Sequence, residues 1–245
     1  MKDKDITIKV ENLEINYKFI QSFSFKKEGL KKTKTKVVNA LKGVSFEINK
    51  GEIIGICGTN GSGKSTLLKA IAGIFSPDKG SIDLYGNSIS LLSIGVGFQK
   101  KLSGYENIYI SGLLLGFTKE EITNKMEEII EFSTLKEHIH NPVSTYSSGM
   151  YSKLAFSITA ILETDIMLID EVFSVGDARF KKKSYAKMKE LIENENRTVI
   201  IVSHSHKTLE KLCNSIIWLE KGNIKEIGPS KEIIEKYEKF LDNEI

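Results

Sequence analysis

The chain has 245 residues, of which 40% are hydrophobic and 27% charged, and its formal net charge is +3. A chain of this size can bury a full core in one large domain, and so small a charge does not by itself indicate nucleic-acid binding. Its uncharged apolar runs are shorter than the roughly 18 residues of a membrane span, and its N-terminus lacks the apolar core of a signal peptide. We therefore expect a globular protein without transmembrane helices that stays in the cytoplasm.

The first two predicted strands lie on either side of a basic insertion. Residues 5–17 and 38–48 alternate between apolar and polar side chains, which is typical of strands with one buried face. The insertion between them, residues 18–37, begins with the aromatic run Phe19–Phe25 and has Glu28 as its one acidic residue. Its lysines are Lys18, Lys26, Lys27, Lys31, Lys32, Lys34 and Lys36. This pattern fits a short amphipathic element that meets anionic lipid headgroups. The lysines equally fit a solvated loop, and the Phe19–Phe25 element could equally cap the sheet.

A complete phosphate-binding loop follows the next apolar run. Residues 53–57 predict a buried strand, and the segment after Thr66 predicts a helix. Between them the sequence matches GxxxxGK[ST] at every fixed position, with the residues Gly58, Thr59, Asn60, Gly61, Ser62, Gly63, Lys64, Ser65 and Thr66. Glycines let backbone N–H groups turn toward a polyphosphate, Lys64 reaches the terminal phosphates, and the Ser65 hydroxyl ligates magnesium. We call Gly58–Thr66 the phosphate loop.

The middle of the chain is predicted to be helical. Ser76–Gly80 is a turn signal, and a strand is expected at residues 81–85. From Gly104 to about Ile139 the pattern is helical, and two capping boxes precede it and interrupt it. These boxes pair Ser103 with Glu106 and Thr118 with Glu121. We expect a helical subdomain over residues 100–163.

The last third alternates between strands and helices. Residues 166–169 and 198–202 are uninterrupted apolar runs, as in parallel strands covered on both faces by helices. A helix is expected over 180–194, a strand over 216–220 followed by a hairpin turn at 221–223, and a final helix from Ser230. The predicted fold class is therefore α/β, with a phosphate-loop core.

Several polar residues follow the predicted strands of this core. Asp170 and Glu171 come directly after the strand 166–169, at the edge where open α/β sheets bind ligands. Asp170 is suited to hold magnesium through water, and Glu171 to act as the base for an attacking water. Gln99 precedes a helix and can reach both metal and water, and His204 follows the strand 198–202. Cys57 and Cys213 have no metal-ligand spacing and are expected to be small buried residues.

A second anion site is predicted at Tyr146–Met150, with the sequence YSSGM, which we call the signature segment. Two hydroxyls and a glycine precede a helical run, residues 151–161, so that backbone N–H groups at the start of a helix face an anion. One subunit does not obviously need two phosphate sites. The second site is therefore expected to serve the nucleotide of a neighbouring chain.

The order of these motifs resembles the nucleotide-binding domain of ABC transporters over essentially the whole chain. The resemblance implies an ATPase core with an antiparallel β subdomain and a helical subdomain, and a homodimer that holds ATP and Mg²⁺ between one phosphate loop and the partner's signature segment. It implies that Ser147, Ser148 and Gly149 lie at the phosphate in trans. It also implies that Asp177 bridges the dimer, that His204 holds the γ-phosphate, and that Tyr17 stacks on adenine.

The YSSGM form, the stretch 91–98, the run 102–108 and the basic insertion together resemble the ATPases of bacterial surface-polysaccharide exporters, which serve O-antigen or teichoic acid. That group implies integral membrane permease subunits, two copies of them, a lipid-linked polysaccharide cargo and a place on the cytoplasmic face of the membrane. We expect residues 1–245 to form one ATPase domain without a C-terminal glycan-binding domain. The alternatives are a soluble ABC ATPase acting on DNA or ribosomes, an ABC ATPase for another substrate, and a phosphate-loop kinase or GTPase.

Overall fold

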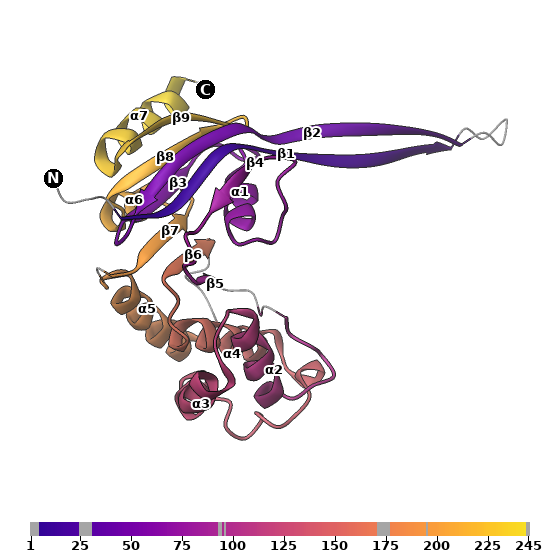
Figure 1. Cartoon of the computed structure of the whole chain (residues 1–245), viewed down its shortest axis with the longest axis vertical. Coiled ribbons are helices and arrows are strands. Elements are labelled where there is room, and N and C mark those ends of the chain that lie inside the picture. Colours follow the sequence, from indigo (N-terminus) through magenta and orange to yellow (C-terminus); the bar gives the residue numbers. More distant parts are fainter. Residues whose placement is uncertain are drawn as a thin grey trace.

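Two β-sheets pack around the short helix α1, and a separate group of helices lies beyond the larger sheet (Figure 1). The computed structural model describes residues 5–24, 31–92, 95, 97–170, 177–194 and 196–243. The smaller sheet is antiparallel, in the order β2-β1-β4, and contains β1 (Ile6–Ser24), β2 (Lys31–Asn49) and β4 (Lys79–Asp83). The larger sheet has the order β5-β6-β7-β3-β8-β9 and is parallel except for its last pair. Its strands are β3 (Ile53–Cys57), β5 (Ile89–Leu92), β6 (Ile166–Asp170), β7 (Thr198–Val202), β8 (Ser215–Glu220) and β9 (Asn223–Pro229).

Helices cover both faces of the larger sheet. Helix α1 (Lys64–Ile71) lies between the sheets, where its leucines and isoleucine join one apolar core. A second core on the opposite face contains side chains of α4, α5, α6 and α7. These helices are α4 (Ser148–Ile161), α5 (Ala178–Ile192), α6 (His206–Leu212) and α7 (Ser230–Asn243). The predicted α/β class, with parallel strands buried on both faces, is confirmed.

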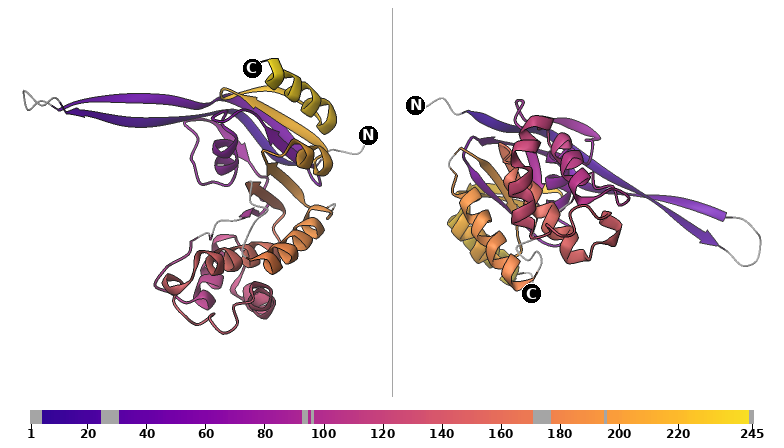
Figure 2. Two further views of the ribbon diagram at one scale, coloured as in Figure 1. Left: turned by 180° about the vertical axis from the view of Figure 1, so that it is seen from behind. Right: turned by 90° about the horizontal axis from the view of Figure 1, so that it is seen from below.

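A third apolar core holds together α2 (Gly104–Leu114), α3 (Lys119–Ser133) and α4, which we call the helical body. Both predicted capping boxes are present at the starts of α2 and α3. Their hydrogen bonds hold the pKa of Glu106 and of Glu121 below the ordinary value. In Figure 1 and in the left panel of Figure 2, the helical body lies apart from α1 and the smaller sheet.

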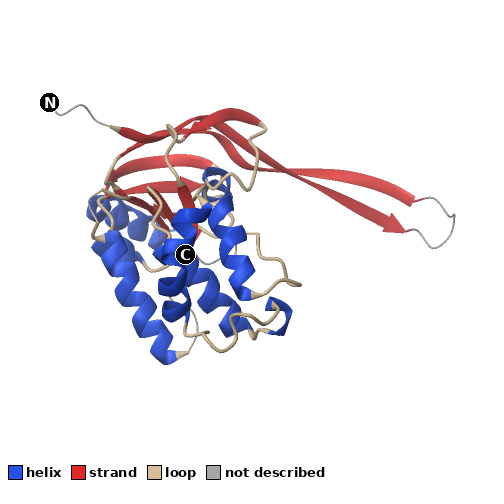
Figure 3. Ribbon diagram, turned by 60° about the horizontal axis from the view of Figure 1, so that its bottom comes forward, coloured by secondary structure: helices blue, strands red, loops and turns tan. Residues whose placement is uncertain are grey.

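The first two strands run further than the sequence pattern predicts. The backbones of β1 and β2 stay paired from Tyr17 and Val38 out to Ser24 and Lys31. This outer part, which we call the hairpin, projects from the body as a two-stranded ribbon (Figures 1 and 3). A sequence pattern detects a strand where one face is buried, and a ribbon that projects from the body need not alternate, so the pattern understates the strand length.

Other element boundaries differ by a few residues. Helix α5 begins at Ala178 rather than Phe180, because the Asp177 side chain caps it. Strand β4 ends at Asp83, and Tyr85 takes a positive φ of 50° in the turn that follows. The strand β5 has no counterpart in the sequence prediction.

Cys57 and Cys213 are buried as expected, and burial raises the pKa of each thiol to about 12. In the described ranges of the chain, none of the helices combines the length and hydropathy needed to span a bilayer.

Candidate functional site

The phosphate loop connects β3 to α1 through glycines that no other residue can replace without strain. Gly58 has a φ of +147°, and a Cβ built on it would lie 2.1 Å from the Leu219 carbonyl oxygen. Gly63 has a φ of +109° and caps α1, where a Cβ would lie 2.7 Å from the Ala40 carbonyl oxygen. The backbone of the neighbouring strands therefore dictates both glycines. The backbone of the adjacent strands therefore fixes the conformation of the loop, whether or not a ligand is bound.

The start of α1 is suited to an anion. No side chain caps α1 among the described residues, whereas α2 to α6 each start with a Ser, Thr or Asp side chain that accepts a backbone N–H. The first N–H groups of a helix carry a partial positive charge and favour anionic partners. Lys64 adds a full charge at the same place, and its Nζ donates to the carbonyls of Gly58 (2.7 Å) and Thr59 (2.9 Å). A phosphate group fits this cradle of N–H groups and ammonium.

The phosphate loop is also fastened to the turn between β8 and β9. The Thr59 hydroxyl donates to the Glu220 carboxylate at 3.2 Å, and the Gly222 N–H donates to the Ser62 carbonyl at 3.0 Å. The carbonyl of Gly222 in turn accepts the Lys42 N–H of β2. These bonds tie the loop to both sheets. Sequence reasoning missed Glu220, since a carboxylate at the end of a strand is a common surface feature.

Tyr17 lies beside the end of the phosphate loop. Its hydroxyl is 3.1 Å from the Thr66 hydroxyl of α1, and its ring meets the Phe75 ring edge to face at 5.8 Å between centroids. Phe19, two residues along β1 and half exposed, lies 6.3 Å away from Tyr17 by the same measure. A partly exposed aromatic surface therefore borders the loop, as the expected adenine platform requires.

The sheet order brings the predicted polar residues to the same edge as the phosphate loop. Parallel strands β6, β7 and β3 are neighbours, with Asp170 opposite Val202 and Val202 opposite Ile56. Asp170 ends β6 and is half-buried, while His204 follows β7 and is exposed. Both therefore lie at the carboxyl edge where β3 runs into the loop. Glu171, and residues 174–176, lie outside the described residues.

Gln99 lies in the segment between β5 and α2, with its side chain exposed. Its Nε2 donates to the Gly97 carbonyl at 3.3 Å, and its backbone N–H donates to Asn107 Oδ1 at 2.6 Å. Sequence reasoning did not single out Asn107. The only available signal is its place within the run 102–108, directly after the capping-box Glu106.

The signature segment forms the start of α4, as predicted, and belongs to the helical body. Ser147 is the cap, and its Oγ accepts the Met150 N–H at 3.2 Å. Ser147 and Ser148 are exposed, and a Cβ added to Gly149 would meet nothing closer than Ser147 Oγ at 3.9 Å. The Tyr146 hydroxyl anchors the segment by donating to the His138 carbonyl at 2.8 Å. The segment thus lies at an exposed helix start in the helical body, which lies apart from α1 of its own chain (Figure 1).

Asp177 is engaged within its own chain. Its Oδ1 accepts the N–H groups of Arg179 (3.1 Å) and Phe180 (3.0 Å) at the start of α5, and its Oδ2 pairs with Lys153 of α4. The Lys153 ammonium, helped by these backbone donors, lowers the pKa of Asp177 to about 2. Its expected role as a bridge between subunits stays a prediction. The structure adds a link from Asp177 to α4, the helix that begins in the signature segment, through Lys153, which sequence reasoning missed.

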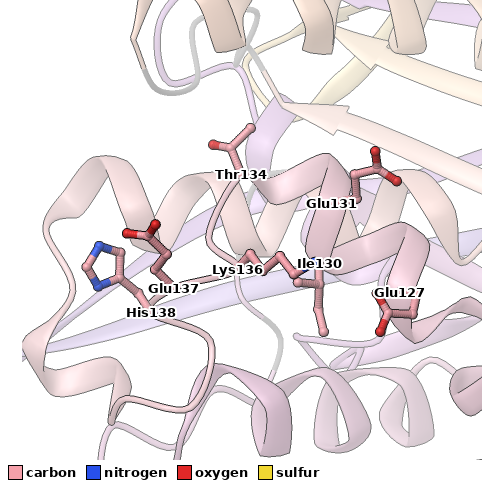
Figure 4. Close-up of a pocket in the computed structure, with 7 residues that line it drawn as sticks. All are labelled: Glu127, Ile130, Glu131, Thr134, Lys136, Glu137 and His138. Atoms are coloured by element: carbon pink, nitrogen blue, oxygen red, sulfur yellow. The ribbon is translucent and has the colours of Figure 1, made fainter.

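A hollow of about 520 Å³ lies elsewhere, at the end of α3 (Figure 4). Its lining comes from α3 and the turn after it, namely Glu127, Ile130, Glu131, Thr134, Lys136, Glu137 and His138. Of the residues discussed above it contains only His138, whose carbonyl accepts the Tyr146 hydroxyl. Within the part of the chain that the structure describes, no three His, Cys, Asp or Glu side chains are grouped to hold a metal ion.

Comparisons with known proteins agree with this arrangement. The family model described as ABC transporter matches residues 41–174, more than half of the chain. An O-antigen export system ATP-binding protein, RfbB of Myxococcus xanthus, is 43% identical over 84% of this chain and 47% of its own length. A teichoic acids export ATP-binding protein, TagH of Bacillus anthracis, is 46% identical over 82% of this chain and 36% of its own length. The chain thus spans half or less of these two relatives.

A solved structure shows the same fold. The dimeric post-hydrolysis structure of the ATP-binding cassette MJ0796, bound to ADP and Pi, superposes with a TM-score of 0.65 at 20% identity. The match covers 91% of this chain and 98% of that one. The expected cassette architecture, with an antiparallel sheet and a helical part attached to the central sheet, is confirmed.

Proposed function

Because this chain belongs to the ABC transporter family, whose members bind ATP, we propose that it is the ATP-hydrolysing subunit of an exporter for lipid-linked surface polysaccharide such as O-antigen or teichoic acid. The relatives named for O-antigen and teichoic acid export support the cargo class. The observation that carries the ATPase assignment is the convergence at one sheet edge of the phosphate loop, Asp170 and His204.

In this proposal each residue has a separate task. The N–H groups of the phosphate loop and Lys64 bind the phosphates, and Tyr17 packs on the adenine. Glu171 accepts a proton from the attacking water, and His204 contacts the γ-phosphate. The hydroxyl of Ser65, the amide oxygen of Gln99 and the carboxylate of Asp170 are oxygen donors of the kind that Mg²⁺ prefers. The metal, when bound, neutralises charge that develops on the phosphates.

We propose further that hydrolysis requires a homodimer. The signature segment belongs to the helical body, with Ser147 and Ser148 exposed and Gly149 half-buried, while the phosphate loop connects β3 of the larger sheet to α1. A second copy placed head to tail would supply its signature segment to this loop. Asp177, which pairs with Lys153 of α4, would then bridge the two subunits near that contact.

The hairpin is the proposed contact with a membrane permease, two copies of which we expect, at the cytoplasmic face of the membrane. The backbone of residues 18–24 and 31–37 projects clear of the body, and Phe19, Val37 and Val38 at its base are each at least 40% exposed. A lysine-rich ribbon that reaches outward can meet anionic headgroups.

We further propose that residues 1–245 act as one ATPase domain, with a helical subdomain over 100–163 and the basic insertion over 18–37.

Two experiments test the proposal. The chain should hydrolyse ATP in the presence of Mg²⁺, and Lys64→Ala should abolish that activity; an undiminished rate in Lys64→Ala would remove the phosphate loop from the reaction. Replacing Lys26, Lys27, Lys31 and Lys32 by glutamate should impair polysaccharide export in cells and leave ATP binding intact. Unchanged export would refute the role of the basic insertion, residues 18–37.

The competing functions predict other partners. A soluble ABC ATPase acting on DNA or ribosomes would purify with nucleic acid rather than with membranes, and an ABC ATPase for another substrate would purify with a permease. If an undecaprenyl-linked glycan stimulates ATP turnover, the result favours polysaccharide export over both of these functions. No response to that glycan, in a complex that contains the permease, would favour another cargo.

A further inference from the structure

The side chain of Asn107 holds the segment that carries Gln99 against the first turn of α2. Asn107 is 0% exposed. Its Oδ1 accepts the Gln99 N–H at 2.6 Å, and its Nδ2 donates to the carbonyls of Gln99 (3.1 Å), Leu102 (3.2 Å) and Ser103 (2.8 Å). The backbone of Gln99 is therefore fixed at both its donor and its acceptor by one buried amide. Its side chain stays exposed to act at the site.

Only an amide satisfies this environment. The Gln99 N–H needs an acceptor and the three carbonyls need a donor, and asparagine is the short side chain that offers both. A carboxylate at position 107 would face the three carbonyl oxygens with no hydrogen to share. An apolar side chain would leave the Gln99 N–H and carbonyl without this partner in a buried place.

The same segment continues into the signature segment. The carbonyls of Lys100 and Leu102 accept the N–H groups of Ser144 (2.8 Å) and Val143 (2.9 Å), and Ser103 forms an isolated bridge with Pro142. Residues 142–145 lead directly into Tyr146 and Ser147. Backbone hydrogen bonds thus join the segment after Gln99 to the segment that leads into α4, and Asn107 fixes Gln99 itself to α2.

On this geometry, and resting on the proposed ATPase function, we propose that Asn107 is a positioning residue for Gln99. It fixes Gln99 to the same rigid unit as the signature segment, so that the two move together when the helical body moves relative to the sheets. Gln99 then reaches the metal and the attacking water in the same movement that brings the signature segment to a partner's nucleotide. Asn107 touches neither nucleotide nor metal and acts through Gln99.

A double-mutant cycle in the full chain tests this proposal by ATP turnover. Asn107→Ala and Gln99→Ala should each lower kcat by about tenfold and change the affinity for ATP less than about twofold, and the double variant should be no slower than either single one. Ile129→Ala, in the core of the helical body on α3, is the control for lost stability: its kcat should stay close to that of the wild type. Effects that multiply in the double variant, or a full kcat in Gln99→Ala or Asn107→Ala, would overturn the proposal.

Amide hydrogen exchange tests the positioning without any turnover. The Gln99 amide should exchange at least about tenfold faster in Asn107→Ala than in the wild type, whereas Ile129→Ala should leave it unchanged. Equal protection of the Gln99 amide in Asn107→Ala would overturn the inference even if the chain hydrolyses ATP. Conversely, loss of that protection in a chain without ATPase activity would sustain the positioning role while the proposed function fails.

Discussion

The two candidate phosphate-binding segments of this chain are built in opposite ways. The phosphate loop is enclosed at its base: Gly58 and Lys64 are buried, Asn60 and Gly61 at its tip are exposed, and hydrogen bonds fasten the loop to both sheets. The signature segment is exposed at Ser147 and Ser148, belongs to the helical body, and is held from behind by Tyr146. Contacts within the chain fix the conformation of the phosphate loop. The exposed start of α4, in contrast, is accessible to a ligand or to another protein chain. The difference is what the proposed site, completed by a second subunit, requires.

The largest expected effect comes from breaking the enclosed segment. In Gly58→Ala the new Cβ would lie 2.1 Å from the Leu219 carbonyl oxygen, so the loop must shift out of its shape. We expect ATP affinity to fall by about 100-fold or more, a cost of roughly 3 kcal/mol. Fluorescent-nucleotide titration measures this affinity.

The matched control for Gly58 is Gly73→Ala. Gly73 also has a positive φ, +72°, but a Cβ there would meet nothing within 4 Å. The control should lose stability of about 1 kcal/mol and keep its ATP affinity. Equal loss of affinity in both variants would mean that backbone strain in general, rather than the close approach behind the phosphate loop, controls binding.

A smaller and different effect is expected at the exposed segment. Since Ser147 Oγ accepts the Met150 N–H, its own hydrogen remains available to donate to a phosphate. Ser147→Ala should therefore lower ATP turnover by about tenfold, leave ATP binding by the monomer unchanged, and cost about 1 kcal/mol of stability through the lost cap. Turnover kinetics and thermal unfolding measure the two effects.

Thr118→Ala provides the comparison for Ser147, since it removes a similar cap from α3 in the same helical body. It should lose comparable stability and keep its turnover. If both variants lose turnover to the same degree, the Ser147 effect reflects instability of the helical body, and the contrast between the two segments disappears.

The smallest expected effect is a pH dependence at the link between α4 and α5. The pKa of Asp177 is lowered from 3.8 to about 2, so the stability from this link is fully present above about pH 4 and is lost as the pH falls toward 2. Lys153→Met removes the main cause of the shift. The difference in Tm between wild type and Lys153→Met should therefore be largest near pH 5 and should narrow toward pH 2. Lys181→Met, an exposed lysine of α5, should show no such trend; a constant difference for Lys153→Met would contradict the assignment.

The sequence alone predicts the residues of the phosphate loop, but it does not predict several of the contacts and strands elsewhere in the fold. The phosphate loop, the strand before it and the two capping boxes are local patterns, and the structure has them where they were expected. Asn107, Lys153 and Glu220 were missed because each acts on a residue distant in sequence or on a backbone group, which leaves no local pattern. The hairpin was missed as a strand because its residues do not alternate between apolar and polar side chains as residues 5–17 do. Strand β5 was missed since serines interrupt its apolar run.

The central claim, that two copies share each site, is tested most directly by the mass of Glu171→Gln with and without ATP. Without its proposed base the variant should hold ATP unhydrolysed and, by light scattering, show twice the 27.5 kDa of one chain, returning to a monomer when the nucleotide is removed. Adding Gly149→Asp should prevent this dimer while ATP still binds the phosphate loop, because a carboxylate at the signature segment repels the partner's phosphates. A Glu171→Gln chain that binds ATP and stays monomeric, or a dimer indifferent to Gly149→Asp, would contradict the account.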